Sequence, residues 1–308
     1  MHWKKLGRVY NPKINIDNLK LKSHGANPLP IQIEDDVYRI YFNGRDERNR
    51  SSIGALDFDL DKREILKVYK KPVFLHGKKD TFYSNGISLG CTYKLKEVNH
   101  IVFMGWSLFK NRQWKGILGR LKIHQNGSLS YEDKYPFFDL SIEDKISISY
   151  PYILKENDKS FKMWYGSMIK WNANNGEMLH LIKYATSKNG IDWLRHGNAI
   201  PYKINFYQAF SKPCVFKESD NLYHMWFSYR GGLNSKYKIG YAKSNNGLNW
   251  KLDLDNSGIQ KSESGWDSEM LCYPHIFQHK SNLYMLYNGN GYGETGFGLA
   301  LLINSKSC

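Results

Sequence analysis

Two ten-residue stretches decide the fold: "YATSKNGIDW", from Tyr184 to Trp193, and "YAKSNNGLNW", from Tyr241 to Trp250. The two stretches agree at their Tyr, Ala, Ser, Asn, Gly and Trp positions, so the second is a copy of the first. Self-similarity at a fixed period indicates a repeat architecture, in which each unit forms one supersecondary structure. Further copies of the same unit are therefore expected elsewhere in the chain.

The repeat extends upstream of both stretches. Each is preceded by an alternating apolar run that starts near a proline, a polar turn and a second run rich in aromatic residues. This upstream half recurs in other parts of the chain, and the five units start near residues 27, 89, 150, 212 and 273. The starts are 62, 61, 62 and 61 residues apart. We name these units repeat one to repeat five.

Each repeat predicts four β-strands. Two alternating runs, a third run of the type "IGYAKS" and a fourth run led by Trp all have the composition of strands. Asn189-Gly190 and Asn246-Gly247 predict tight hairpins between the third and fourth strands, because both residue types tolerate a positive φ. No segment has a helical period. The sequence therefore predicts an all-β fold, a five-bladed β-propeller with four antiparallel strands in each blade.

The two ends of the chain are predicted to share one blade. "HWKKLGRVYNP", at residues 2–12, resembles the fourth strand of repeat three, with Trp3 at the position of Trp193. Repeat five stops after its third strand, "GFGLALLINS". Residues 2–10 are therefore expected to complete blade five and close the ring, which removes the exposed edges of an open array. The whole chain, residues 1–308, is predicted to form a single domain.

The charge of the chain is strongly basic. Lys and Arg number 44 against 29 Asp and Glu, which gives a net charge of +15. Such a balance indicates an anionic partner, and the alternative is a solvated lysine-rich surface. The lysines are spread along the chain with no run of five or more, which argues against nucleic acid as that partner.

Targeting and cysteine patterns indicate a cytoplasmic protein. No apolar run approaches the length of a membrane span, and the N-terminus lacks the apolar core of a secretory signal. Cys91, Cys214, Cys272 and Cys308 are isolated, without the spacing of a zinc site. We therefore expect reduced thiols, no bound metal and no cofactor.

A propeller places its functional groups at one mouth of a central channel. The segments before each repeat and the loops between its second and third strands return to the same face, and loops on a rigid scaffold commonly carry function. These segments are rich in Asn, Ser, Tyr, Trp and Gly, which suits a polyhydroxylated ligand. The side chains expected to bind substrate are His24, Asn27, Arg45, Asp46, Arg48, Asn85, Trp106, Tyr150, Arg230, Tyr273, His275 and Asn290.

The same segments resemble a known enzyme group. The five repeats, the outer hairpin "ATS-x-NG-x-x-W", "YRIYFNGRDERNRSSIG" and "GWDSEMLCYPHIFQHKSNLYMLYNGNGYG" are similar to the five-bladed propeller glycosidases and glycoside phosphorylases. These include the arabinanase/xylosidase group and the mannoside phosphorylase group. The likeness covers nearly the whole chain. It implies a carbohydrate-active protein with its site at the mouth of the channel.

The resemblance also implies carboxylates at the starts of the inner strands, since inverting glycosidases need an acid and a base. Those glycosidases resemble one another in an Asp-Pro at blade one, where this chain has Asn27-Pro28, and an amide cannot act as a base. The remaining candidate acids are Asp80, Asp267 and Glu269. Asp80 and Asp267 precede their repeats in similar positions, which leaves a structural role open. Glu269 is our candidate catalytic acid, expected in the channel mouth, and an ordinary surface residue is its alternative.

Arginines supply a possible anion site. Arg45, Arg48 and Arg50, with Arg230 on another returning loop, offer donors that suit phosphate or carboxylate, and similar basic groups hold phosphate in the phosphorylases that the chain resembles. The alternative is that these arginines pair with Asp46 and Glu47 to order the loop. Two functions follow. One is a glycosidase-like or phosphorylase-like enzyme acting on an anionic or phosphate-bearing sugar. The other is a non-hydrolytic sugar-binding or glycan-biosynthesis propeller that has lost the usual carboxylates.

Overall fold

The computed structural model describes residues 1–15, 18–109, 113–232 and 234–303. Nearly all regular structure in these residues is strand, and the helical turns η1 (Pro12–Asn15), η3 (Leu254–Asn256) and α1 (Asn290–Gly293) are short. The prediction of an all-β fold is therefore confirmed. None of the helices in the described residues has the length and apolar composition needed to cross a membrane.

The first four repeats each form four strands in antiparallel order. Their bounds are β2 (Ser23–Glu34), β3 (Val37–Arg45), β4 (Ser51–Asp59) and β5 (Glu64–Val68) in repeat one; β6 (Gly86–Leu95), β7 (Val98–Leu108), β8 (Trp114–Ile123) and β9 (Leu129–Ser130) in repeat two; β10 (Ser147–Asn157), β11 (Ser160–Lys170), β12 (Leu179–Ser187) and β13 (Leu194–Asn198) in repeat three; and β14 (Ala209–Ser219), β15 (Leu222–Arg230), β16 (Lys238–Ser244) and β17 (Trp250–Leu252) in repeat four.

Repeat five takes its outer strand from the other end of the chain. Strands β18 (Cys272–His279), β19 (Asn282–Asn288) and β20 (Phe297–Ile303) pair in sequence, and β1 (His2–Tyr10) pairs antiparallel with β20. The first and last strands of the described chain thus share one sheet.

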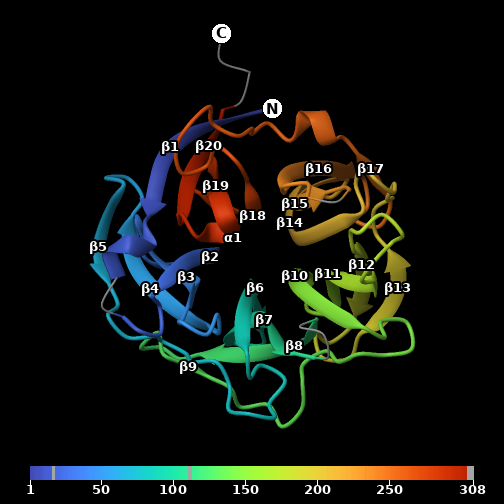
Figure 1. Ribbon diagram of the computed structural model, residues 1–308, viewed down its shortest axis with the longest axis horizontal. Coiled ribbons are helices and arrows are strands. Elements are labelled where there is room, and N and C mark those ends of the chain that lie inside the picture. The colour runs from blue at the N-terminus through green and yellow to red at the C-terminus, as the bar shows by residue number, and fades with distance from the viewer. Residues whose placement is uncertain (16–17, 110–112, 233, 304–308) are drawn as a thin grey trace.

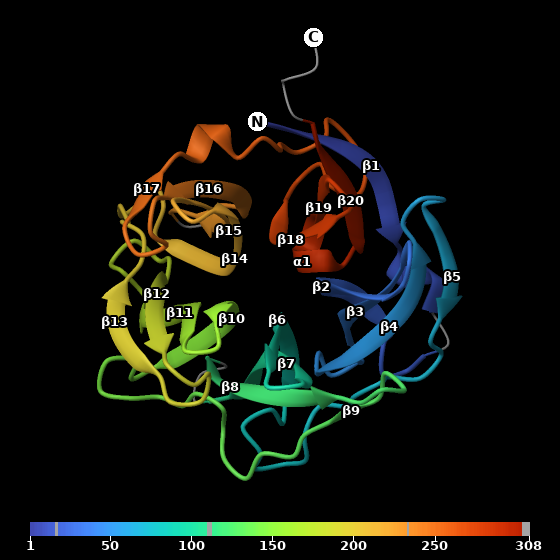
Figure 2. The same ribbon diagram turned by 180° about the vertical axis from the view of Figure 1, so that it is seen from behind.

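The five groups of strands surround a common centre (Figure 1). The first strand of each repeat, β2, β6, β10, β14 or β18, lies nearest the centre, and the fourth strand lies at the periphery (Figures 1 and 2). Single parallel contacts connect repeat one to repeat two, at Ser51 and Gly86, and repeat three to repeat four, at His180 and Ala209.

The hydrophobic core is divided into clusters between neighbouring repeats. One cluster joins repeats three and four, for example through Trp164 and Phe210, which are both fully buried. Another joins repeats five and one, where Tyr10 of β1 packs with Phe42 and Phe297. Each repeat therefore depends on its neighbours for the burial of its apolar faces, and the cluster around Tyr10 holds the two ends of the chain together.

A bulge interrupts every inner strand at the start of its repeat. The registers shift near Asn27, Leu89, Tyr150, Lys212 and Tyr273. Four of these residues precede a proline and have positive φ angles of 51°, 42°, 52° and 56°, in the order Asn27, Tyr150, Lys212, Tyr273. Proline lacks the N–H that a regular ladder needs, so the strand bulges there. The bulge turns these four side chains away from the regular alternation.

Two local predictions differ from the structure. The inner strands begin one to four residues before the predicted starts, because the bulge lies inside the strand and not at its first residue. The Asn-Gly pairs do not form two-residue hairpins, since six residues separate β12 from β13 and only the glycines, Gly190 and Gly247, have positive φ.

The thiols in the described chain are all reduced. Cys91, Cys214 and Cys272 are free and buried. Burial raises the pKa of Cys91 to about 12 and that of Cys214 to about 11, so both are protonated thiols at neutral pH. The fourth cysteine, Cys308, lies outside the described residues.

Candidate functional site

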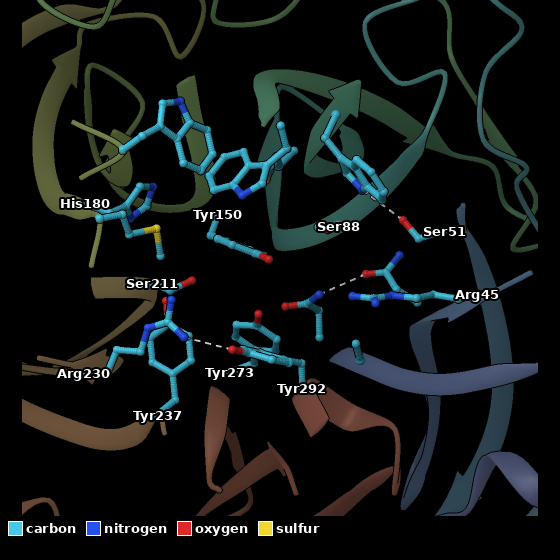
Figure 3. Close-up of a pocket in the computed structure, with 18 of the residues that line it drawn as sticks. Arg45, Ser51, Ser88, Tyr150, His180, Ser211, Arg230, Tyr237, Tyr273 and Tyr292 are labelled. Atoms are coloured by element: carbon cyan, nitrogen blue, oxygen red, sulfur yellow. Dashed lines mark hydrogen bonds between the residues drawn. The ribbon is translucent and has the colours of Figure 1, made fainter. Parts of the chain in front are cut away.

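A cavity of about 480 Å³ is lined by residues of the inner strands, of the ends of second strands and of the starts of third strands. It lies on the face on which the sequence placed the functional loops. Side chains from all five repeats contribute to it (Figure 3). The lining residues are Ala26, Asn27, Asn43, Arg45, Ser51, Ser88, Met104, Trp106, Leu108, Trp114, Tyr150, Trp171, Gly176, Glu177, Met178, His180, Ser211, Arg230, Tyr237, Tyr273 and Tyr292.

Aromatic rings form much of the cavity wall. Trp114 and Trp171 meet edge to face with their ring centroids 5.3 Å apart. Tyr150 and Tyr273, the bulge residues of repeats three and five, stack at 5.4 Å. Trp106 completes this side and donates its indole N–H to the hydroxyl of Ser51 at 3.2 Å. Such rings offer flat apolar surfaces with polar tips at their edges.

One carboxylate, that of Glu177, lines the cavity among the described residues. Arg230 approaches both of its oxygens: Nη2 donates to Oε1 at 3.0 Å, and Nε lies 3.0 Å from Oε2 in an ion-pair contact without hydrogen-bond geometry. Arg230 also donates to the hydroxyl of Tyr292 at 2.9 Å and stacks over the ring of Tyr237 (Figure 3). Glu177 of repeat three and Arg230 of repeat four therefore form an ion pair that joins the two repeats.

Arg45 differs from Arg230 in having no partner of this kind. Within the described residues, its guanidinium makes no hydrogen bond and no ion pair. It is half-buried at the end of β3, and it lies on the side of the cavity opposite Arg230 (Figure 3). Its charge helps to lower the pKa of His24 to about 3, although burial of that ring is the larger cause. Arg45 thus presents an uncompensated cation to the cavity.

Asn27 and Asn43 stand beside Arg45 and are both 2% exposed. The amide of Asn27 donates to Asn43 Oδ1 at 3.3 Å, and the same oxygen accepts from the backbone N–H of Leu89 at 2.8 Å. Asn27 Oδ1 and Asn43 Nδ2 are buried and have no hydrogen-bond partner in the described structure.

His180 forms the wall between repeats three and four. Its Nδ1 is bonded to the carbonyl of Phe210, which can only accept, so this nitrogen carries the proton. Its Nε2 then accepts from the hydroxyl of Ser149 at 3.0 Å. Burial lowers the pKa of His180 to about 4, opposed in part by the Phe210 carbonyl. The ring is therefore neutral near pH 7, with both nitrogens occupied.

Two further polar residues, on the inner strands β14 and β18, are buried and do not line the cavity. Lys212 is fully buried and donates to the carbonyl of Gly90 in repeat two. His275 is 6% exposed, and its Nδ1 has no partner among the described residues. Burial, and then the charge of Lys212, lower the pKa of His275 well below its usual value.

The structure brings six of the predicted substrate-binding residues together. Asn27, Arg45, Trp106, Tyr150, Arg230 and Tyr273 all line the cavity. All six were expected at inner-strand starts or in the returning loops. Trp106 lies at the end of β7, where the second strand of repeat two returns to the same face.

The three predicted catalytic acids are not among the lining residues. Glu269 is exposed on the bend before β18, so a catalytic role for it stays a prediction. Asp80 is exposed with φ 71° in the loop before repeat two. Asp267 is 2% exposed and pairs with Lys5 at 2.7 Å and with the hydroxyl of Tyr287 at 3.1 Å. Asp267 thus connects β1 to repeat five.

The other predicted binding residues also lie outside the cavity lining. Asp46 accepts from the backbone N–H groups of Arg48 and Arg50 and pairs with the Arg50 guanidinium, so it orders its loop. Arg48 itself is exposed. Asn85 and Asn290 accept from the backbone at Leu108 and at residues 269–270. His24 and His275 are largely buried beside the cavity.

Several lining residues were missed in the sequence. Glu177 lies in the loop of residues 166–177 that the repeat pattern assigned to this face, and it is the acid of that loop. Asn43 and His180 lie inside strands, so loop composition could not single them out. Trp114, Trp171, Tyr237 and Tyr292 belong to the returning segments, and their aromatic character was the available signal.

No metal site is evident at the cavity. Within residues 1–15, 18–109, 113–232 and 234–303, no three His, Cys, Asp or Glu side chains gather closely enough to hold a metal ion.

Two proteins of Mycobacterium tuberculosis are similar to this chain along its whole length. The uncharacterized proteins MT1551 (strain CDC 1551 / Oshkosh) and Rv1502 (strain ATCC 25618 / H37Rv) are each 36% identical to it over 306 residues. The alignments cover 99% of this chain and 100% of each relative. No model of a known protein family matches the chain.

Solved structures with the same fold are glycoside hydrolases. A glycoside hydrolase superposes with a TM-score of 0.74 at 14% identity, covering 99% of this chain and 94% of its own. A GH130 structure, from work on mannoside phosphorylases and hydrolases of β-1,2 mannosidic linkages in Candida mannan, gives 0.71 at 14% identity, over 99% and 95% of the chains. An α-L-arabinanase of Penicillium chrysogenum gives 0.60 at 10% identity, over 100% of both. These are five-bladed propeller enzymes, so the resemblance is confirmed for the fold.

Proposed function

The chain belongs to the same family as the Mycobacterium tuberculosis proteins MT1551 and Rv1502, and we propose that this protein binds an anionic saccharide in its central cavity without two-carboxylate hydrolysis. We also infer that its five groups of strands are the blades of a single propeller domain. The anion is a carboxylate or a phosphate on the sugar. This is the non-hydrolytic alternative that Asn27 raised in the sequence.

The observation that carries the proposal is the distribution of charge in the cavity. Its carboxylate, Glu177, is neutralised by Arg230, whereas Arg45 has no anionic partner among the described residues. A half-buried guanidinium gains most from a ligand that supplies carboxylate or phosphate oxygens. The expected ligand therefore carries a negative charge next to Arg45.

The rest of the lining supports a sugar. The volume of about 480 Å³ lies within the roughly 300–1,000 Å³ of small-ligand sites. Tryptophan and tyrosine rings supply flat surfaces, and serine and asparagine side chains supply neutral donors and acceptors. The solved structures with this fold are carbohydrate-active enzymes, which supports the same ligand class.

Paired-carboxylate hydrolysis has less support. An inverting glycosidase needs two carboxyl groups about 6.5–9.5 Å apart, and a retaining one needs two about 5–5.5 Å apart. Among the described residues the cavity lining contains one carboxylate, that of Glu177, and its oxygens are already paired with Arg230. Turnover of a glycoside through Glu177 is the second candidate, favoured by the position of Glu177 inside the cavity.

The binding proposal is tested by thermal shift and calorimetry with D-glucuronate, D-galacturonate, glucose 6-phosphate and galactose 6-phosphate, with glucose and galactose as neutral controls. A ligand at 100 times its Kd should stabilise the folded state by about 2.7 kcal/mol. Arg45→Ala should weaken the binding of the anionic sugars at least tenfold and leave the binding of the neutral sugars unchanged. Arg48→Ala is the matched control, because this neighbouring arginine is exposed and outside the cavity. Equal effects of the two variants would contradict the proposal.

Turnover is tested separately with nitrophenyl glycosides and oligosaccharides, with and without phosphate. The binding proposal expects no turnover by the unmodified protein. If turnover occurs, Glu177→Gln should reduce kcat by a factor of about 10² or more when Glu177 is the acid–base group. Glu269→Gln is the matched comparison. A loss confined to Glu269→Gln would restore the acid predicted from the sequence.

A further inference from the structure

Two atoms in the cavity wall lack the partners that their chemistry requires. Asn27 Oδ1 is an acceptor, Asn43 Nδ2 is a donor, and neither has a hydrogen-bond partner within the described structure. Both side chains are 2% exposed, and both line the cavity. Buried polar groups are normally paired, and each unpaired one calls for an explanation.

The orientation of both amides follows from their other contacts. The backbone N–H of Leu89 can only donate, so the Asn43 atom that faces it at 2.8 Å is the oxygen. The same oxygen faces the amide of Asn27 at 3.3 Å, so the Asn27 atom in that contact is the nitrogen. The free atoms are therefore an oxygen on Asn27 and an N–H on Asn43.

The backbone holds this pair in place. Asn27 has φ 51° and its N–H donates to Asn288 Oδ1 of repeat five at 2.9 Å. Asparagine is among the few residues that adopt a positive φ readily. Asn43 and Arg45 are two residues apart on β3, so their side chains leave the same face of the strand about 7 Å apart. The free acceptor, the free donor and the unpaired cation thus form one wall of the cavity.

We propose that Asn27 recognises the sugar hydroxyl next to the carbon whose anionic substituent binds Arg45, and that Asn43 donates to a second oxygen of the same ligand. A sugar hydroxyl can donate to Asn27 Oδ1, and a second ligand oxygen can accept from Asn43 Nδ2. The proposal rests on the proposed function, because it assumes an anionic sugar in the cavity. It adds that the site discriminates the configuration of the neighbouring hydroxyl.

The test compares sugar acids that differ only at that hydroxyl. D-glucuronate and D-galacturonate are epimers at C4, which neighbours the carbon that bears the carboxylate. Glucose 6-phosphate and galactose 6-phosphate provide the same comparison with a phosphate and distinguish the two sources of the anion. Dissociation constants are measured by calorimetry for the unmodified protein, Asn27→Ala and Asn85→Ala.

The unmodified protein should prefer one epimer of the sugar acids or of the sugar phosphates by about tenfold, the effect of leaving a buried acceptor unpaired. Asn27→Ala should reduce this preference to within twofold and keep the discrimination between anionic and neutral sugars. Asn85→Ala should keep the epimer preference and the discrimination between anionic and neutral sugars. The Asn85 amide is outside the cavity lining and accepts from the backbone N–H of Leu108.

The two proposals fail in different ways. An epimer preference that is absent from the unmodified protein, or that survives in Asn27→Ala, would overturn the hydroxyl recognition while Arg45-dependent binding stands. No binding of any of the four anionic sugars would overturn the proposed function, and the hydroxyl recognition with it. If circular dichroism shows that Asn27→Ala is unfolded, Asn27→Ser is used in its place. The shorter serine side chain keeps a polar group but cannot reach both Asn43 and the sugar hydroxyl.

Discussion

Lys212 is the residue in which charge and burial conflict most strongly. It is fully buried, and Gly90 supplies its one hydrogen-bond acceptor in the described structure. Burial lowers the pKa of Lys212 from 10.5 to about 8, opposed in part by Cys214 and Cys91. The charge of Lys212 also helps to lower the pKa of His275 on β18, after burial of that ring as the larger cause. The folded protein therefore carries a costly cation below about pH 8.

This conflict predicts an unusual dependence of stability on pH. Between about pH 8 and 10.5 the unfolded chain keeps the Lys212 proton that the folded protein has released, so this group makes stability rise with pH. Lys212→Met should remove that rise and stabilise the protein at pH 7, by up to about 3 kcal/mol. Chemical denaturation at pH 7, 8, 9 and 10 measures both effects. Lys243→Met, at an exposed position on β16, is the control, and an equal pH slope in both variants would contradict the assignment.

Single residues also mark where prediction from sequence fails. The sequence located Asn27, Tyr150 and Tyr273, because each precedes a proline at the start of a repeat. Its candidate acids, Asp80, Asp267 and Glu269, all lie shortly before a repeat start, and Glu177 was not among them. Glu177 reaches the cavity through the path of the loop after β11, and the exposed position of Glu269 depends on where β18 begins. Neither feature is encoded in local composition.

The outer turns are the elements that explain the repeated ten-residue stretch. Ser244 Oγ accepts from the backbone of Asn246 and Gly247, and Asn246 Oδ1 accepts from Leu248 and Asn249 at 2.8 and 3.0 Å. Ser187 and Asn189 form the same arrangement in repeat three. The residues shared by the two stretches thus specify a side-chain-capped turn of five or six residues and not a two-residue hairpin.

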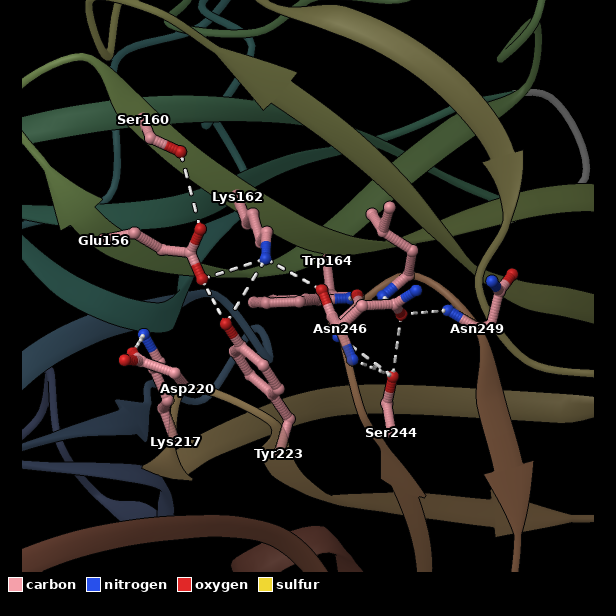
Figure 4. A network of polar contacts seen from close by, with 12 residues as sticks. Glu156, Ser160, Lys162, Trp164, Lys217, Asp220, Tyr223, Ser244, Asn246 and Asn249 are labelled. Atoms are coloured by element: carbon pink, nitrogen blue, oxygen red, sulfur yellow. Dashed lines mark hydrogen bonds and ion pairs between the residues drawn. The ribbon is translucent and has the colours of Figure 1, made fainter.

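The turn of repeat four also contacts the preceding repeat. Trp164 of repeat three donates to the carbonyl of Gly247 at 3.2 Å, and Lys162 donates to the carbonyl of Asn246 at 2.8 Å (Figure 4). Lys162 pairs in turn with Glu156, which also accepts from the hydroxyl of Tyr223 in repeat four (Figure 4). The turn therefore joins two repeats on the outside of the ring.

A substitution in this turn should weaken the contact between repeats three and four. Gly247 has φ 71°, and an added Cβ would lie 3.4 Å from both Lys162 Nζ and the Trp164 ring. Gly247→Ala should cost about 1–2 kcal/mol, because a left-handed backbone disfavours a side chain. Denaturant titration measures the loss. Asn249→Ala is the control, since only its backbone N–H is used in the turn. No loss in Gly247→Ala would mean that the turn contributes little to stability.

At the scale of the whole molecule, the period of the repeats was the most informative signal. It located every inner strand to within four residues and gave the all-β class. It could not specify how side chains from five repeats combine, because the cavity brings together residues more than 200 positions apart. Fold was therefore more predictable than site.

Removal of the first ten residues tests how far the molecule depends on contact between its ends. β1 pairs with β20, Lys5 pairs with the buried Asp267, and Tyr10 packs with Phe42 and Phe297. The shortened chain should melt at least 10 °C lower or aggregate, because β20 becomes an exposed edge and a core cluster loses Tyr10. Lys4→Ala, an exposed change on β1, should melt normally. A melting temperature within two degrees of the full chain would show that the strand is dispensable.

The pairing of β1 with β20 also has a consequence for biosynthesis. The ribosome makes β1 long before its partner strand, Phe297–Ile303, because nearly the whole described chain lies between the two strands. At about 5–20 residues per second, translation of the intervening chain leaves β1 without its partner for roughly 15 to 60 seconds. During that interval the nascent chain exposes Trp3 and Tyr10, which are buried in the finished protein. A chaperone that shields the emerging N-terminus should therefore raise the yield of folded protein, and a stop codon placed before β20 should yield aggregated product.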